Sequence, residues 1–340
     1  MDDLDDATLD VVQLDGVVVL KIINHCRENQ PELVTGQLLG LDVGSTLEVT
    51  NCFPFPTRLE DEEELEKDGQ SSSASNSTAE YQIEMMRCLR EVNIDHYNVG
   101  WYSSTYMGSF INESTIETQY IYQERIKKSI VLIYDPLKSA QGTVCLKAYR
   151  LTQAFMDLQK SQSFTKEGLA KHNVSYHDVF EEIPIQITNS NLVNAFLHEL
   201  EDSNANLSDT SSSFLDCDFE RLNLSTNPFL EKNIEYLVEC LDELANEQNT
   251  YQQYQRNAQR QQAQLNAWIQ KRKMENAARK LNGEELLPEE DPSLSKPIPE
   301  PSRLPSLLAT NQTENYCQQI KQFAATSFAK LFMIEGIHKE

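Results

Sequence analysis

The chain has 340 residues, enough for one sizeable core and an additional module. It carries 29 Lys and Arg against 53 Asp and Glu, which gives a formal charge of −24. A surface this acidic repels the nucleic-acid backbone at long range, which argues against a broad RNA- or DNA-binding face and leaves only a local basic patch open. High net charge also keeps a component of an assembly soluble, and that is the simpler interpretation.

The sequence favours a soluble intracellular protein. The acidic tail over residues 1–10 has no basic region followed by an apolar core, so no signal peptide is expected. No apolar run approaches the ~20 residues that span a bilayer. The seven cysteines are scattered singly without a C-x-x-C pair. That spacing is typical of reduced thiols in the cytosol or nucleus.

Helix and strand patterns alternate from residue 11 to about residue 203, as in a domain with helices packed on a sheet. Asp15 is expected to cap a helix that runs to about Arg27 and is apolar nearly all round, hence buried. Its β-branched residues leave a strand as the alternative. Strands over 34–41 and 46–55 follow, joined by a hairpin in which Gly44 supplies a positive φ.

Residues 57–78 interrupt this pattern with an acidic run and a serine tract. They offer too little apolar surface to offset the entropy of ordering, so we expect a mobile surface insertion there. Beyond it, Tyr81, Met85 and Leu89 share one face of a helix, and Met85 is expected to fill the core. The next expected elements are a strand over 98–102, a helix from about Asn112, strands over 130–134 and 144–151, two short helices, a strand over 183–187 and a helix over 189–201.

The character changes to all-helical after a polar linker over residues 204–228. A helix over 229–282 carries a heptad seam. Residues 231–247 hold six acids and one Lys, whereas residues 250–282 hold seven bases and one acid. The seam consists of Ile234, Leu237, Leu241, Leu244, Gln248 and Tyr251 and continues in the same register through Gln255, Ala258, Gln262, Leu265 and Ile269.

A proline-rich spacer over 283–303 separates this helix from an amphipathic one over 304–335. Asn311 fits an N-cap there, with Glu314 as its reciprocal partner. Tyr316, Ile320 and Phe323 form an apolar side that must be covered, either by the long helix or by another chain of an assembly. Both possibilities remain open on the sequence alone.

Gly100-Trp101-Tyr102 opens a loop where a zinc hydrolase places two histidines. Together with Gln119 it resembles the frame of an MPN (JAB/JAMM) domain, whose metalloprotease members use a Glu on an early strand, a His-x-His pair, a Ser and an Asp. Glu32 lies one residue from the Glu position, and that offset points to the opposite face of a strand. The five corresponding positions in this sequence are Leu33, Ser103, Thr105, Glu113 and Ile116.

The resemblance implies an MPN domain over 11–151 with an extension over 152–203. The fold class is then α+β, an α/β/α arrangement with a mixed sheet, followed by an extended C-terminal helical region. The substitutions leave no cage for Zn²⁺ and no general base, so we expect no enzyme, metal or cofactor. A zinc isopeptidase is the alternative from another class. It would bind about one zinc per chain and cleave ubiquitin-like conjugates in a chelator-sensitive way.

Five segments spread over nearly the whole chain carry a second resemblance. They are Asn51-Cys52-Phe53-Pro54-Phe55-Pro56, Tyr134-Asp135-Pro136, Leu146-Lys147-Ala148-Tyr149-Arg150-Leu151, Leu287-Pro288-Glu289-Glu290-Asp291 and Lys330-Leu331-Phe332-Met333. With these segments the chain resembles a non-catalytic MPN subunit of translation initiation factor 3.

This resemblance implies a cytoplasmic scaffold that supports small ribosomal subunit binding, preinitiation complex assembly and mRNA recruitment. Its partners would be other subunits of that factor, including a second MPN subunit, with the ribosomal subunit contacted through the complex, mRNA indirectly and no membrane. A component of a proteasome-lid or signalosome-like assembly is the alternative.

That resemblance also implies two interaction surfaces. Ile234, Leu237, Leu241 and Leu244 would pack in a helical bundle built by several subunits, and Tyr316, Ile320 and Phe323 would add a second contact.

Overall fold

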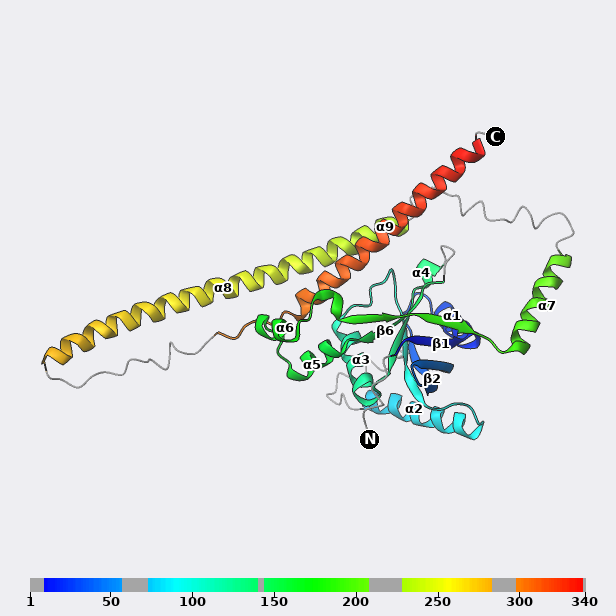
Figure 1. The fold of residues 1–340 in the computed structure, drawn as a ribbon, viewed down its shortest axis with the longest axis horizontal. Coiled ribbons are helices and arrows are strands. Elements are labelled where there is room, and N and C mark those ends of the chain that lie inside the picture. Colours follow the sequence, from blue (N-terminus) through cyan, green and yellow to red (C-terminus); the bar gives the residue numbers. More distant parts are fainter. Residues whose placement is uncertain (1–8, 57–72, 140–143, 208–227, 283–297, 339–340) are drawn as a thin grey trace.

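Helices cover both faces of one mixed sheet, and two long helices, α8 (Pro228–Asn282) and α9 (Leu304–His338), follow it (Figure 1). The computed structural model describes residues 9–56, 73–139, 144–207, 228–282 and 298–338. The predicted fold class, an α+β domain with a mixed sheet and a helical C-terminal region, is confirmed. Among the described residues, no helix is both long and apolar enough to cross a membrane.

The sheet has eight strands in the order β7-β6-β5-β4-β2-β3-β1-β8. β1 runs parallel to β3 and β8, β4 runs parallel to β5, and the other neighbours are antiparallel. The strands are β1 (Val11–Asp15), β2 (Thr35–Val43), β3 (Thr46–Pro54), β4 (Asn98–Ser104), β5 (Ile130–Tyr134), β6 (Leu146–Leu151), β7 (Phe180–Ile183) and β8 (Ile185–Thr188).

The single strand expected over 183–187 is wrong, because Pro184 divides this segment into β7 and β8. Proline has no N–H to continue a ladder. Ile183 pairs with Ala148 at one end of the strand order, and Ile185 pairs with Val12 at the other. The backbone N–H of Val12 also donates to the carbonyl of Pro184 at 3.0 Å. Residues 180–188 therefore join both edges, and the sheet curls onto itself.

The helix α1 (Gly16–Glu28) covers one face of the sheet and begins at its predicted cap, where the carboxylate of Asp15 accepts from the N–H of Val17 at 3.4 Å. The expectation that this helix is buried all round is wrong. Val18 and Ile22 are fully buried against the sheet, whereas 68% of Leu20 is exposed. Only one layer covers the helix, so only one of its faces enters the core.

The opposite face is covered by α3 (Glu113–Arg125), which begins at Asn112 as predicted. The side chain of Asn112 accepts from the N–H of Thr115 at 3.1 Å. Gln119 is fully buried beneath this helix, accepts from the indole N–H of Trp101 at 2.9 Å and donates to the carbonyl of Ser129 at 3.0 Å. Gln119 thus satisfies buried polar groups between α3 and the sheet.

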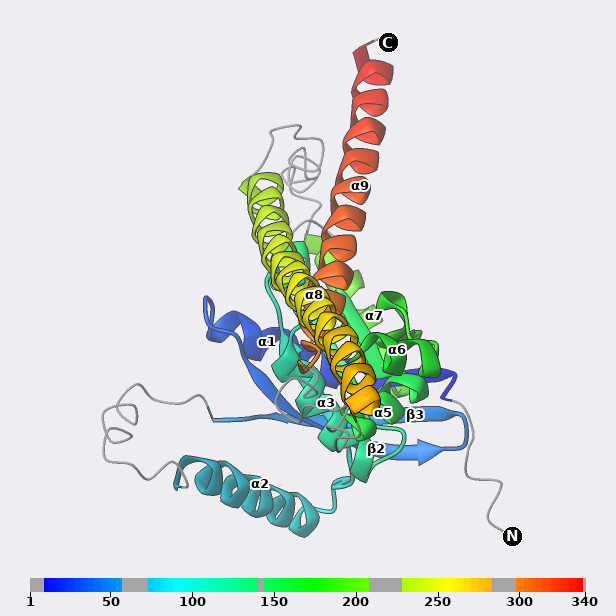
Figure 2. The same ribbon diagram turned by 90° about the vertical axis from the view of Figure 1, so that its left-hand side faces the viewer.

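The helix α2 (Ser73–Glu91) begins inside the segment expected to be a mobile insertion, so that expectation is wrong for residues 73–78. Residues 57–72 lie outside the described residues. From Glu80 on, where its side chains are described, no residue of α2 is buried. Met85 is only half-buried and does not fill the core. The helix therefore lies at the periphery of the domain, as Figure 2 shows.

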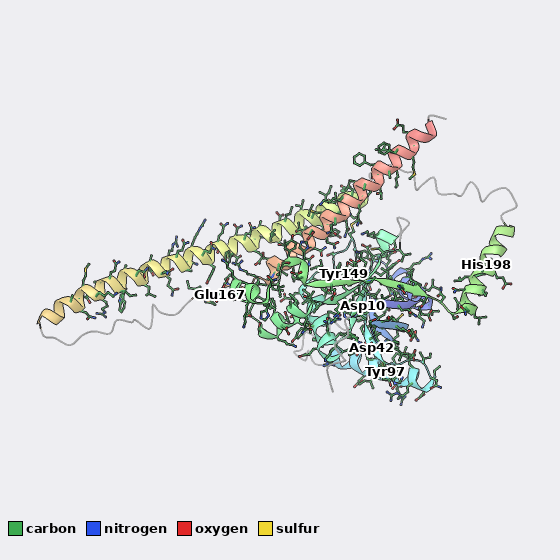
Figure 3. The ribbon with its side chains drawn as sticks, in the orientation of Figure 1. Asp10, Asp42, Tyr97, Tyr149, Glu167 and His198 are labelled. Atoms are coloured by element: carbon green, nitrogen blue, oxygen red, sulfur yellow. The ribbon has the colours of Figure 1, made fainter. Side chains whose placement is uncertain are left out.

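The remaining helices follow the predicted order, with one difference in length. The helix α7 (Asn191–Leu207) continues past the expected end at residue 201, and residues 208–227 of the expected linker lie outside the described residues. Figure 3 places His198 of α7 well away from the sheet. The short elements are α4 (Pro136–Ser139), α5 (Gln153–Ser161), α6 (Lys166–His172) and the 3₁₀ turn η3 (Tyr176–Asp178).

The helix α9 begins at Leu304, so the N-cap expected at Asn311 is wrong. Proline is tolerated in the first turn of a helix, where its missing N–H would have no partner. Pro305 therefore lies within the helix and not in the spacer. The N–H of Leu304 instead reaches the hydroxyl of Ser302 at 3.3 Å.

Acid is expected to destabilise the sheet domain through His25. The hydroxyl of Tyr102 lies 2.9 Å from Nδ1 of His25. Burial lowers the pKa of His25, and the nearby carboxylate of Glu28 only partly opposes this. Below the unfolded-state pKa of about 6.5 the unfolded chain takes up a proton that the folded chain resists, so stability falls as the pH falls. Urea denaturation at pH 7.5 and pH 5.5 should show a smaller loss for His25→Gln than for the unchanged chain. An equal loss in both would contradict this assignment.

Candidate functional site

The five positions that correspond to metal-site residues lie in different environments. Leu33 is 58% exposed, and Glu113 is exposed in the first turn of α3. Ser103 is half-buried and donates to the carbonyl of Ser104 at 3.1 Å. Thr105 is buried, and its N–H donates to the carbonyl of Tyr134 at 2.9 Å. Ile116 is fully buried.

These residues do not fit a zinc ion. Ile116 stands where the family's metalloproteases have an aspartate, and it belongs to the same apolar cluster as Leu304 and Leu308 of α9. Zn²⁺ needs N, S or carboxylate ligands, none of which this cluster supplies. Within the described part of the chain, no three His, Cys, Asp or Glu side chains are grouped to hold a metal ion. Ile116 therefore packs with the first turns of α9.

The loop over residues 105–112 between β4 and α3 is the docking point for α9. Met107 and Gly108 have left-handed backbones, with φ of 55° and 74°. The carbonyl of Gly108 accepts from the side-chain amides of Gln312 and Asn315, each at 2.8 Å. The oxygen of Gln312 in turn accepts from the N–H of Ile111 at 3.3 Å. Polar side chains of α9 therefore bind the loop backbone directly.

Gly108 is needed for this close approach. A Cβ at this position would lie 2.3 Å from Nε2 of Gln319 and 2.9 Å from Nδ2 of Asn315. The left-handed φ already favours glycine.

Tyr316 lies where the loop, α8 and α9 meet. It is 1% exposed, and its ring stacks on Tyr236 of α8 with centroids 6.1 Å apart and an interplanar angle of 13°. Burial raises the pKa of Tyr316, while hydrogen bonds with the side chains of Ser109 and Gln312 oppose the rise. The phenol is thus held protonated between the three segments.

Three further contacts fix the long helices. Nδ1 of His177 lies 3.0 Å from the carboxylate of Glu314. The guanidinium of Arg303 lies 4.1 Å from the ring centroid of Tyr251, which ties α8 to the start of α9. The N–H of Arg303 donates to the carbonyl of Phe164 at 3.0 Å. The base of the helix pair is therefore attached to both the sheet domain and its extension.

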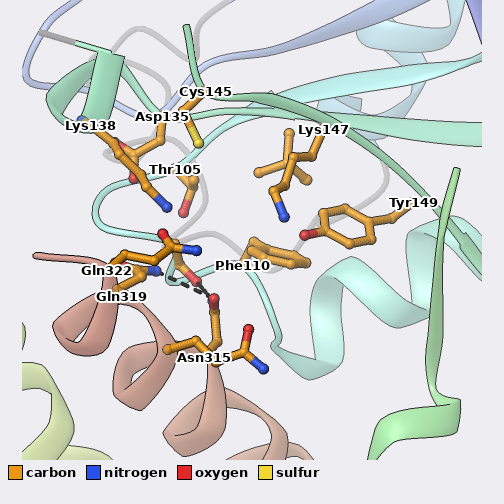
Figure 4. Close-up of a pocket in the computed structure, with 13 residues that line it drawn as sticks. Thr105, Phe110, Asp135, Lys138, Cys145, Lys147, Tyr149, Asn315, Gln319 and Gln322 are labelled. Carbon is orange, nitrogen blue, oxygen red and sulfur yellow. Dashed lines mark hydrogen bonds between the residues drawn. The ribbon is translucent and has the colours of Figure 1, made fainter. Parts of the chain in front are cut away.

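A small cavity of about 50 Å³ lies between α9 and the loop (Figure 4). Asp135 lies at its wall, 2% exposed, with Oδ1 accepting from the N–H groups of Leu137 and Lys138, each at 3.1 Å. Burial raises the pKa of Asp135, which those backbone bonds partly oppose. A space of this size suits ordered water.

The predicted seam of α8 is divided between two environments. Leu237 and Leu244 are half-buried, whereas Ile234 and Leu241 are 46% and 45% exposed. The less exposed positions form an inward line that consists of Asn233, Leu237, Cys240, Leu244, Glu247 and Tyr251. Compared with the predicted seam, every second position of this line is shifted by one residue. Tyr236 lies beside this line and stacks on α9, a contact that was not predicted from the sequence.

The outward positions form an apolar stripe that we call the outer stripe. It consists of Ile234, Val238 and Leu241, which are 46%, 50% and 45% exposed. Of the residues predicted on α9, Tyr316 is covered within the chain, and Ile320 and Phe323 are half-buried. Further along α9, four apolar side chains are exposed: Phe328, Leu331, Phe332 and Met333.

Some docking residues carry no sequence signal. Gln312 lies one helical turn before the buried Tyr316, on the same face of α9, and Asn315 lies beside that face. A neutral amide at such a position gives no indication that it binds the backbone of a distant loop. The residues next to Gly108 do not indicate its role, because that role depends on α9, which begins almost 200 residues later.

Comparison with known proteins gives a consistent result over both halves of the chain. The model of the family described as the C-terminal region of eIF3h matches residues 139–340. The model described as JAB1/Mov34/MPN/PAD-1 ubiquitin protease matches residues 7–128. The chain is 54% identical to the H subunit of eukaryotic translation initiation factor 3 from Arabidopsis thaliana over 332 residues, covering 97% of this chain and 93% of that protein.

Two more distant relatives carry the same name. The H subunit from Dictyostelium discoideum is 48% identical and covers 99% of this chain and 97% of its own length. That from Nematostella vectensis is 45% identical and covers 97% of this chain and 94% of its own length.

Proposed function

The chain belongs to the family of the H subunit of eukaryotic translation initiation factor 3, and from that membership we propose that it is a non-catalytic scaffold of the factor. In this role it supports small ribosomal subunit binding, preinitiation complex assembly and mRNA recruitment in the cytoplasm. The observation that carries the proposal is the apolar cluster that Ile116, at the position that the MPN resemblance assigns to an aspartate ligand, forms with Leu304 and Leu308.

Two features support a scaffold. In the loop over 105–112, the carbonyl of Gly108 accepts hydrogen bonds from two side chains of α9, so the loop serves to dock this helix. The outer stripe is apolar and exposed, as expected of a helix that completes its packing on other chains. Its partners are other subunits of the factor, with a second MPN subunit against the sheet domain. The ribosomal subunit is then reached through the complex, and mRNA indirectly.

Disrupting the outer stripe is expected to release the chain from the factor. Ile234→Asp with Leu241→Asp places two carboxylates on a face that the chain itself leaves exposed, so the isolated protein should stay folded. Burying an unpaired charge in an interface costs several kcal/mol, which corresponds to a loss of co-purifying subunits of tenfold or more. Leu237→Asp is expected to have the same effect and also to lower stability, because Leu237 is half-buried within the chain.

The measurement is quantitative mass spectrometry of proteins that co-purify with the tagged chain, with circular dichroism to verify folding. Asn246→Asp with Thr250→Asp is the matched control, since both residues are exposed and polar on the same helix. Full retention of factor 3 subunits by the Ile234 and Leu241 variant would overturn the assignment of this stripe. Co-purification with proteasome-lid or signalosome subunits instead would favour the alternative assembly.

A further inference from the structure

The second half of α8 has the opposite charge to the rest of the molecule. Residues 250–282 hold seven of the 29 basic residues but only one of the 53 acids. The single acid, Glu275, is paired with Arg272 at 3.1 Å. This segment is therefore strongly cationic on an otherwise acidic chain, and a polyanion repelled elsewhere is directed to it.

This basic segment stands clear of the sheet domain. Figures 1 and 3 show the second half of α8 extending away from the sheet, and among the described elements only α9 packs extensively on α8. Tyr236, which stacks on Tyr316 of α9, lies before this basic segment, and Tyr251, which contacts Arg303, lies at its very start. At 1.5 Å per residue, the stretch over 250–277 is about 42 Å long. It is long enough to follow several phosphates of a nucleic-acid strand.

The exposed side chains of this stretch suit phosphate and base contacts. The exposed bases are Arg256, Arg260, Lys271 and Lys273. Between residues 250 and 277, nine Gln and Asn side chains are also exposed, and these amides can donate to phosphate, sugar or base edges. Trp268 is half-buried, with the guanidinium of Arg272 at 5.2 Å from its ring centroid. An aromatic ring beside cationic groups is a platform on which an unpaired base can stack.

A protein helix is a poorer fit to the same surface. Helix–helix contacts need a continuous apolar seam, with charges confined to its flanks. At 3.6 residues per turn, the exposed bases Arg256, Arg260 and Lys271 fall within about 60° of one another around the helix. Met274, at 74% exposure, is the only large apolar side chain exposed in the described part of the stretch. Charge without an apolar seam favours a flexible polyanion over a folded acidic partner.

We propose that the stretch of α8 over residues 250–277 binds the backbone of single-stranded RNA directly. This goes beyond the scaffold role, which requires no contact between this chain and RNA. The contact is electrostatic and independent of base sequence, and it weakens steeply with salt.

The test is fluorescence anisotropy of the full chain with a fluorescein-labelled oligouridylate of about 20 nucleotides, at several salt concentrations. The quadruple variant Arg256→Gln, Arg260→Gln, Lys271→Gln and Lys273→Gln should bind at least tenfold more weakly. Its log–log salt slope should be smaller by about 3, near 0.7 for each lost phosphate contact. The matched control replaces the exposed Arg90, Lys127, Lys166 and Lys171 of the sheet domain by Gln and should bind like the unchanged chain.

Tryptophan fluorescence gives a second readout, which a change in net charge alone would not affect. Trp101 is 5% exposed in the core, so a change in fluorescence on adding RNA reports on Trp268. Trp268→Phe should abolish the fluorescence change while anisotropy still shows binding. Equal weakening in both quadruple variants, or a Trp268 signal indifferent to RNA, would overturn the proposal. Tighter binding of poly-L-glutamate than of oligouridylate at equal charge concentration would assign the surface to an acidic protein instead. Co-purification with factor 3 subunits should not change in the α8 quadruple variant, which separates this test from that of the scaffold role.

Discussion

Replacing Tyr316 with alanine is expected to lower the free energy of unfolding by about 3–5 kcal/mol, the range for a fully buried aromatic residue. The ring is 1% exposed and packs between the loop over 105–112 and Tyr236 of α8. Its removal leaves a cavity where both long helices meet the loop that joins β4 to α3. The two helices should therefore lose their attachment before the sheet itself unfolds.

Hydrogen exchange and urea denaturation of the full chain check this expectation. Amides of α9 from Leu304 to Phe323 should lose protection, while those of β4 and β5 keep it. Tyr316→Phe preserves the ring and should cost about 1 kcal/mol for the lost hydrogen bonds. Phe332→Ala is the matched control, because Phe332 lies on the same helix but is 72% exposed. Equal effects of Tyr316→Ala and Phe332→Ala would show that the junction is not a point of attachment.

Gly100→Ala is expected to prevent the sheet from forming, at a cost of about 3 kcal/mol or more, which is at the upper end for single substitutions. Gly100 has φ of 153°, and a Cβ would lie 2.0 Å from the carbonyl oxygen of Ile130 on the adjacent strand. That oxygen belongs to the backbone of β5, so it cannot move away as a side chain could. The parallel pair β4 and β5 would have to separate.

Two other glycines provide graded controls. Gly44 has φ of 65° with no atom within 4 Å of the added Cβ, so Gly44→Ala should cost only about 1 kcal/mol of backbone strain. Gly336 lies in α9 with open space around it, and Gly336→Ala should stabilise the helix by up to about 1 kcal/mol. Soluble expression and the urea midpoint of unfolding, measured for each of the three variants, should rank Gly336→Ala as the most stable and Gly100→Ala as the least stable. A Gly100→Ala protein as stable as Gly44→Ala would contradict the steric argument.

The parts of the fold that could be predicted from sequence are those set by local chemistry. Asp15 and Asn112 cap their helices because a short polar side chain precedes an apolar run, and Gly44 turns the hairpin because it admits a positive φ. The all-apolar β5 predicted a strand buried on both faces, and Ile130 and Val131 do belong to different clusters. Each of these signals lies within a few residues of its effect.

The predictions made from the sequence fail where a segment distant along the chain decides the local structure. The heptad spacing of α8 fits two neighbouring lines equally well, and only the position of α9 selects the one that includes Cys240 over the one that includes Leu241. Pro305 reads as a helix breaker unless the helix begins beside it. The docking loop was identified in sequence by its missing ligands, but what fills it was not, because Gln312 and Asn315 show their function only once α9 is in place.

Because residues 180–188 join both edges of the sheet, the sheet can be completed only after this segment has been synthesised. Val12 is among the first residues made, yet its partner Ile185 follows 173 residues later. A nascent chain shorter than this has a sheet with two open edges, which are templates for pairing with other chains. Such distant pairings also make folding slow. A premature stop before residue 188 should therefore yield an aggregating product and not a smaller folded domain, and chaperones have their longest access to this protein before β8 is made.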